Sequence, residues 1–148
     1  MPTVKGEPEW LKRALEDARR EGRLKEASVA HAPAGPGTRT KLKQSEAEFQ
    51  KELCDYARRL GWKIAHFRKV RVQRKGGSVY WETPVAEDGK GFLDLELCRE
   101  RLVKVELKVK PRKPSPEQLE WVDAYKRAGV EVYVWYPENW PQIEEVLR

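Results

Sequence analysis

The stretch FLDLELCRERLVKVELKVKPRKPSPEQ, residues 92–118, contains two apolar-rich runs on either side of the short polar segment 99–101. Successive side chains of a β-strand point to opposite faces, so every second residue shares a face. The pattern predicts a β-hairpin that reverses at Glu100. One face of this hairpin is aliphatic and is formed by Leu93, Leu95, Leu97, Val103, Val105, Leu107 and Val109.

The opposite face of the predicted hairpin is charged and carries Asp94, Glu96, Lys104, Glu106, Lys108 and Lys110. A reversal at Glu100 places Asp94 opposite Glu106. Two carboxylates that face each other repel unless a cation lies between them. Because Mg²⁺ prefers oxygen ligands, Asp94 and Glu106 are predicted to hold a divalent metal. Lys108 follows on the same face, where it can polarise a water or neutralise charge on a phosphate.

A helix is predicted to begin after Ser45, because Ser45 and Glu48 have the spacing of a capping box. At about 100° per residue, Glu46 falls on the same side of this helix as the apolar residues Phe49 and Leu53. An unpaired carboxylate on an inward face is costly. A first-turn acid favoured by the helix dipole is the alternative explanation of Glu46.

A basic segment follows this helix: residues 63–75 contain six Lys or Arg and no acid. We expect a strand at 62–70 and then a two-stranded ribbon, 70–73 with 79–81, that turns at Gly76 and Gly77. A ribbon with a basic tip is also a common soluble surface. The candidate phosphate contacts are Arg68, Lys69, Arg71, Arg74 and Lys75, and Trp81 can stack on bases.

The segment after the hairpin predicts a helix that begins at Ser115, with Pro116 in its first turn and Gln118 as a capping residue. A strand rich in β-branched and aromatic residues is expected at 130–136. The connection from the second hairpin strand through this helix has the length of a right-handed crossover, so the two strands should be parallel neighbours. The predicted fold is therefore α/β, with a mixed central sheet flanked by helices.

The N-terminal region differs in character from the rest. We divide the chain into a charged helix in residues 1–27, a flexible basic linker in 28–44 and a domain in 45–148. The helix itself is expected from about Pro8 to Glu26, with a thin apolar stripe. It could serve as a DNA-tracking arm, a dimerisation helix or a solubilising tail.

The composition narrows the class of protein. The chain has 148 residues and a net charge of +6, a balance that permits nucleic-acid binding. Cys54 and Cys98 lack the spacing of a disulfide framework, which suits a reduced cytoplasmic protein. No segment approaches the roughly 18 apolar residues of a membrane span, so no membrane association is expected.

An acidic residue followed on the next strand by E-x-K is the pattern of the PD-(D/E)xK nuclease superfamily. The chain resembles its virus-type replication-repair nuclease (VRR-NUC) domain over about residues 45–148. The family usually has proline before the aspartate, where this chain has Leu93. The residues that carry the resemblance are Ser45-Glu46, Phe49-Gln50, Gly61-Trp62, Thr83-Pro84, Gly91 to Asp94, Glu106-Leu107-Lys108, Ser115 to Gln118 and Val134-Trp135.

The resemblance implies a restriction-endonuclease-like core with an N-terminal helical extension, and a Mg²⁺- or Mn²⁺-dependent DNA endonuclease, similar to Holliday-junction resolvases. It implies metal ligation by Glu46, Asp94, Glu106 and the carbonyl of Leu107. Lys108 would act in catalysis, and Gln118 would bind the attacking water or a phosphate if it is more than a cap.

The resemblance further implies branched DNA as substrate, a homodimer, and a role in replication, recombination or repair in the cytoplasm of a bacterium or a phage-infected cell. A catalytically weak or inactive nucleic-acid-binding module on the same fold is the alternative that Leu93 supports.

Overall fold

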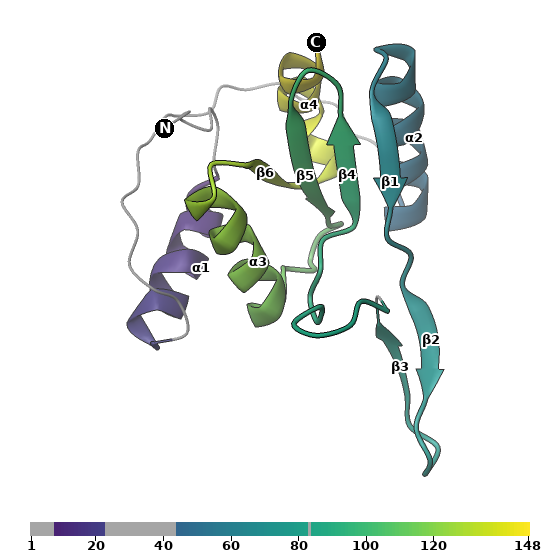
Figure 1. Ribbon diagram of the computed structural model, residues 1–148, viewed down its shortest axis with the longest axis vertical. Coiled ribbons are helices and arrows are strands. Elements are labelled where there is room, and N and C mark those ends of the chain that lie inside the picture. The colour runs from purple at the N-terminus through teal and green to yellow at the C-terminus, as the bar shows by residue number, and fades with distance from the viewer. Residues whose placement is uncertain (1–7, 23–43, 83) are drawn as a thin grey trace.

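A four-stranded mixed sheet forms the centre of the protein (Figure 1). The computed structural model describes residues 8–22, 44–82 and 84–148. The strands lie in the order β1, β4, β5, β6, and their bounds are Lys63–His66, Leu95–Cys98, Leu102–Leu107 and Glu131–Trp135. Strand β4 is antiparallel to both of its neighbours, β1 and β5, whereas β5 and β6 are parallel.

The predicted hairpin is formed by β4 and β5. Leu95 pairs with Val105 and Glu96 pairs with Lys104, which is the register expected for a reversal at Glu100. The aliphatic residues within the two strands are buried in one core cluster: Leu95, Leu97, Val103, Val105 and Leu107. Leu93, which precedes β4, is instead buried in the second cluster with Leu119 and Val122, and Val109, beyond β5, is half-buried. The register is therefore confirmed, and the division into an aliphatic and a charged face holds within the strands but not for Leu93.

Helix α3 (Pro116–Arg127) connects β5 to its parallel neighbour β6. The capping box at its start is present: Gln118 N donates to Ser115 Oγ at 3.2 Å, and Ser115 N donates to Gln118 Oε1 at 2.9 Å. The parallel pairing of these two strands confirms the crossover that the sequence predicted.

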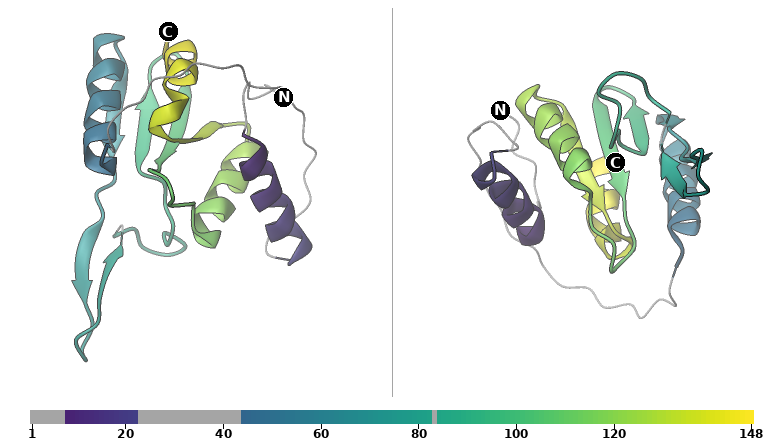
Figure 2. Two further views of the ribbon diagram at one scale, coloured as in Figure 1. Left: turned by 180° about the vertical axis from the view of Figure 1, so that it is seen from behind. Right: turned by 90° about the horizontal axis from the view of Figure 1, so that it is seen from below.

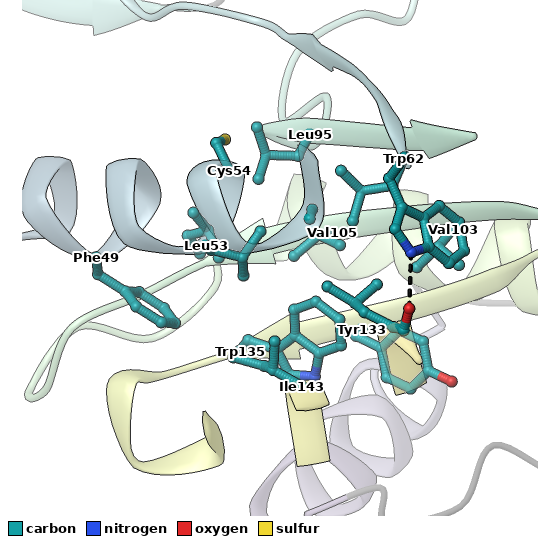
Figure 3. Packing of buried hydrophobic residues seen from close by; sticks show 14 residues of the cluster. Phe49, Leu53, Cys54, Trp62, Leu95, Val103, Val105, Tyr133, Trp135 and Ile143 are labelled. Atoms are coloured by element: carbon teal, nitrogen blue, oxygen red, sulfur yellow. Dashed lines mark hydrogen bonds between the residues drawn. The ribbon is translucent and has the colours of Figure 1, made fainter. Parts of the chain in front are cut away.

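Two helices cover the aliphatic face of the sheet. They are α2 (Glu46–Arg59) and α4 (Trp140–Leu147), which follows the short 3-10 helix Pro137–Asn139. Phe49 and Leu53 of α2 are completely buried and pack with Leu95, Val105 and Trp135 of the sheet (Figure 3). The indole of Trp62 donates to the carbonyl of Leu147 at 2.8 Å, which ties the end of α4 to the start of β1.

Helix α3 covers the other face, and α1 (Glu9–Arg20) packs against α3 (Figure 2). Leu11 and Leu15 of α1 are almost fully buried in a cluster with Leu119 and Val122 of α3. Arg19 Nη2 lies 3.1 Å from Oδ1 of the buried Asp123. The predicted helix is present over residues 9–20 and ends earlier than expected, at Arg20; residues 23–26 of the prediction lie outside the described residues. Its thin apolar stripe is used for packing inside this chain.

Lys104 is fully buried on the charged face of the hairpin. Its Nζ lies 4.4 Å from the ring centroid of Phe92, 4.8 Å from that of Phe67 and 5.3 Å from that of Tyr125. Glu96 Oε2 is 3.4 Å away. Cation-π contacts and one ion pair together offset the cost of burying this ammonium. Burial nevertheless lowers the pKa of Lys104, against the attraction of Glu96.

The remaining two strands form a separate ribbon that projects away from the central sheet (Figure 1). Its strands are β2 (Val70–Gln73) and β3 (Val79–Glu82), paired antiparallel. Gly76 and Gly77 at the turn have φ values of +121° and +92°, a conformation that residues with a Cβ rarely adopt. The predicted ribbon and its turn are confirmed.

The strand expected at 62–70 is shorter, because β1 ends at His66 and residues 67–69 belong to neither sheet. The linker predicted at 28–44 lies outside the described residues except for Gln44, so it stays a prediction. Within the described part of the chain, no helix is both long and apolar enough to cross a membrane.

The packing of α1 gives a stability prediction. Leu15→Ala removes a side chain that is 3% exposed, so we expect the free energy of unfolding to fall by about 2–4 kcal/mol in urea denaturation. The control Glu16→Ala changes the exposed side of the same helix and should stay within about 0.5 kcal/mol of the wild type. Equal stability of the two variants would show that α1 does not fold cooperatively with the rest of the protein.

Candidate active site

The predicted site residues meet at one end of the central sheet. At this end β1 and β5 finish, β4 starts, and the N-termini of α2 and α3 begin. The side chains gathered there come from α2, β5 and α3 and from the residues that follow β1, precede β4 and follow β5, and several are buried. Such an arrangement allows groups far apart in the sequence to approach one another.

Asp94 immediately precedes β4 and is 5% exposed. Its backbone carbonyl accepts a hydrogen bond from Phe67 N at 2.8 Å, which joins it to the end of β1. Its Oδ2 accepts from Leu107 N at 3.0 Å, which joins it to the end of β5. Asp94 therefore lies against the strand that carries Glu106, as the hairpin register predicted.

Glu106 is completely buried beside Asp94. Its Oε1 accepts hydrogen bonds from Lys108 Nζ and from Gln118 Nε2, both at 2.5 Å. Its Oε2 is buried and has no hydrogen-bond partner. Burial raises the pKa of Glu106, and the charge of Asp94 raises it further, so that it reaches about 7 although Lys108 and Lys69 oppose the shift.

Gln118 performs two roles with one amide group. Its Oε1 accepts from Ser115 N and so caps α3, while its Nε2 donates to Glu106 Oε1. The sequence left a capping role and a site role as alternatives. In the structure, the capping hydrogen bond of Oε1 orients the amide group so that its nitrogen points toward the buried carboxyl of Glu106.

Glu46 and Lys69 complete the site. Lys69 Nζ lies 3.6 Å from Glu46 Oε1 and 3.6 Å from Asp94 Oδ1, so one ammonium bridges two of the predicted metal ligands. Burial acts to lower the pKa of Lys69, but the attraction of Asp94, Glu106 and Glu46 outweighs it and the pKa is raised. Arg112 Nη1 lies 3.9 Å from Glu46 Oε2.

The structure separates the predicted residues into two groups. Glu46, Asp94, Glu106, Leu107, Lys108 and Gln118 come together, and Lys69 joins them although it was expected among the nucleic-acid contacts. The other basic candidates and the exposed Trp81 lie on the ribbon or at its base: Arg68, Arg71, Arg74 and Lys75. Leu107 enters the site through its amide N–H, whereas a metal-binding role of its carbonyl stays a prediction.

Arg112 was missed by the sequence analysis. It lies in the proline-containing segment between β5 and α3, and its backbone carbonyl accepts from Tyr136 Oη at 2.8 Å. No local spacing relates it to Glu46. Only the path of the chain after β5 brings the two side chains together.

The fit to a divalent metal depends on the carboxyl oxygens. In residues 8–22, 44–82 and 84–148, no three His, Cys, Asp or Glu side chains form a group that could hold a metal ion in this arrangement. Oε2 of Glu106 is nevertheless a buried acceptor without a partner. An oxygen of this kind, with Asp94 beside it, is chemically suited to a hard cation such as Mg²⁺.

The raised pKa of Glu106 predicts a pH dependence of stability. Between about pH 4.5 and 7 the folded protein binds more protons at this carboxyl than the unfolded chain, whose carboxyl keeps its ordinary pKa of 4.5. The contribution of Glu106 is therefore complete below pH 4.5 and is lost as the pH rises through 7. Relative to Glu106→Gln, wild-type stability should fall across this window by on the order of 1–3 kcal/mol.

Urea denaturation from pH 4.5 to 7.5, with a chelator present, measures this difference. Glu120→Gln makes the same chemical change at an exposed position of α3 and serves as the control. A wild-type protein that gains stability over Glu106→Gln as the pH rises would contradict the assigned direction.

Comparison with solved structures finds similarity to a chain described as "VRR_NUC domain", with 21% sequence identity and a TM-score of 0.47. The similarity covers 69% of this chain and 92% of that chain. A scan against protein-family models finds no match. No curated protein matches either. The description of the similar structure names the same family that the motifs of this sequence resemble.

Proposed function

We propose that this protein is a Mg²⁺- or Mn²⁺-dependent nuclease that hydrolyses phosphodiester bonds in DNA as an endonuclease. The observation that carries the proposal is the environment of Glu106. This carboxyl is buried beside Asp94, one of its oxygens contacts Lys108, and the other has no hydrogen-bond partner. Acidic oxygens next to an amine suit a hard cation and the charge of a phosphate.

The proposed roles follow from these positions. The groups that would hold the metal are Glu46, Asp94, Glu106 and the carbonyl oxygen of Leu107. When bound, the metal would supply Lewis-acid polarisation of the phosphate. Lys108 would donate a hydrogen bond to a phosphate oxygen or take part in proton transfer from the attacking water. Gln118 donates a hydrogen bond to Glu106 and would also bind the attacking water or a phosphate oxygen.

Contact with DNA is assigned to the ribbon and its base. Arg71 lies directly opposite Trp81 in the ribbon, and Trp81 is 67% exposed. Arg74 lies over the ring of Tyr80, with its Cζ 5.1 Å from the ring centroid. Exposed basic side chains neutralise phosphates, and an exposed indole can stack on a base. The contacts proposed here are Arg68, Lys69, Arg71, Arg74, Lys75 and Trp81.

The sequence resemblance extends the proposal to branched or structured DNA, to a homodimer, and to a role in replication, recombination or repair. The alternative function is a binding module with weak or no catalysis. Lys69 supports this alternative, because its ammonium already neutralises Asp94 and Glu46. Titration with Mn²⁺ distinguishes the two: the nuclease should bind the ion and lose binding in Asp94→Asn, whereas the module should bind none.

The first functional prediction concerns Lys108. Lys108→Ala should lower the rate of DNA cleavage in Mg²⁺ by at least about a hundredfold, because it removes the amine beside Glu106. DNA affinity should change by less than about threefold, since the side chain is 5% exposed and adds little to the charge of the surface. Cleavage is measured on a panel of single-stranded, duplex, flap and four-way substrates.

Lys110→Ala is the matched control, because Lys110 lies two residues further along and its Nζ is 3.7 Å from Glu138 Oε1 at the surface. It should cleave like the wild type. Thermal unfolding checks that both variants are folded. Unchanged cleavage by folded Lys108→Ala would remove the proposed catalytic role.

The second functional prediction concerns the ribbon. The double variant Arg71→Gln and Lys75→Gln should bind DNA more weakly, and the slope of log affinity against log salt should become shallower by about 2. Fluorescence anisotropy at several salt concentrations, with Ca²⁺ to avoid cleavage, measures both quantities.

The control for the ribbon variant is Lys51→Gln with Arg58→Gln, which removes two exposed basic side chains from α2. Its salt slope should match that of the wild type. If the two double variants behave alike, net charge accounts for binding and the ribbon has no special role.

A further inference from the structure

Lys69 occupies a position that its place in the sequence did not suggest. It lies in the connection 67–69 between the central sheet and the ribbon, yet its Nζ is 3.6 Å from both Glu46 Oε1 and Asp94 Oδ1. Its side chain keeps 31% of its exposure, so it is neither a core residue nor a freely solvated one. A single residue of the connection thus links the base of the ribbon to two carboxylates from different elements.

A divalent cation held by these carboxylates would compete with this ammonium. The two positive charges would stand within a few ångströms of each other in a partly buried site, where their repulsion is poorly screened. Glu46 and Asp94 cannot offer the same oxygens fully to both. Arg112 pairs with the other oxygen of Glu46, Oε2. Its side chain is 75% exposed, so breaking this ion pair would cost little free energy.

We propose that Lys69 is a built-in counter-ion of Glu46 and Asp94, that a divalent cation displaces it, and that the released ammonium then binds a phosphate of the nucleic acid. The inference rests on the proposed function, because it assumes that these carboxylates receive a metal. It adds a step that links the metal site to the nucleic-acid surface through one side chain of this protein.

The location of Lys69 explains why a phosphate would be its second partner. Arg68 and Arg71 flank it in sequence, and both are exposed at the base of the ribbon. When its ammonium leaves the carboxylates, Lys69 remains part of the connection between the ribbon and the site. A DNA strand bound along the ribbon and leading toward Glu106 would have to pass Lys69.

The exchange has a thermodynamic consequence. Coupling between two ligands is reciprocal, so a divalent ion should strengthen DNA binding and DNA should strengthen binding of the ion by the same factor. Lys69 would carry part of this coupling, because only in the presence of the ion is its charge available to a phosphate. Methionine at this position keeps the aliphatic stem and removes the charge.

The test begins with calorimetric titration of Mn²⁺ into the full chain without DNA. Lys69→Met should bind Mn²⁺ roughly 3- to 30-fold more tightly than the wild type, because no ammonium has to be displaced. Lys63→Met makes the same substitution at an exposed position of β1 that has no proposed role, and its Mn²⁺ affinity should stay within about twofold of the wild type. Circular dichroism establishes that each variant is folded.

A second measurement follows the released ammonium. DNA affinity is measured by anisotropy in a chelator and in Ca²⁺, and the gain on adding Ca²⁺ should be at least about threefold smaller in Lys69→Met than in the wild type. Equal or weaker Mn²⁺ binding by Lys69→Met, with binding still lost in Asp94→Asn, would overturn the counter-ion role while the proposed nuclease stands. Failure of the wild type to bind Mn²⁺ would overturn both.

Discussion

The arrangement of the functional end of this protein depends on one buried carboxyl group. Glu106 has no exposed surface, and an acidic group in such a position is stable only if it is protonated or surrounded by partners. Lys108, directly after the same strand, and Gln118 on α3 supply two of these partners. Asp94 adds a charge of the same sign, held in place by the backbone amide of Leu107. Strand pairing, helix capping and the electrostatics of the pocket therefore constrain one another.

The alternation of side chains along β5 places several charged groups on a face of the sheet that is buried. Lys104, Glu106 and Lys108 must share the face opposite the aliphatic core, because every second residue of β5 points that way. The protein accommodates each of them differently. Lys104 is enclosed by Phe67, Phe92 and Tyr125, whereas Lys108 contacts Glu106 directly. Charges at three alternate positions are thus buried under α3, which supplies Tyr125 and Gln118, and under Phe67 and Phe92 from the segments before β2 and β4.

The sequence predicts the parts of this structure that depend on short-range patterns. The hairpin register, the capping boxes at Ser45 and Ser115, and the ribbon turn at its two glycines all follow from local periodicity or spacing. The docking of α1 on α3 and the approach of Arg112 to Glu46 do not, because both depend on where distant segments meet. The position of Lys69 was missed for a related reason: a strand pattern was expected to continue where the chain leaves the sheet. The prediction that Asp94 and Glu106 lie side by side is intermediate, because this contact between two strands depends on one local feature, the reversal at Glu100.

The balance of charge around Glu46 bears on how a highly anionic polymer could approach. Three basic side chains form ion pairs with the three carboxyl groups at this end of the sheet: Lys69 with Glu46 and Asp94, Lys108 with Glu106, and Arg112 with Glu46. An acidic pocket without such pairs would present a negative potential and push a polyanion away at the moment of encounter. Local electroneutrality removes that barrier, so the surrounding basic surface can determine the direction from which the polymer arrives.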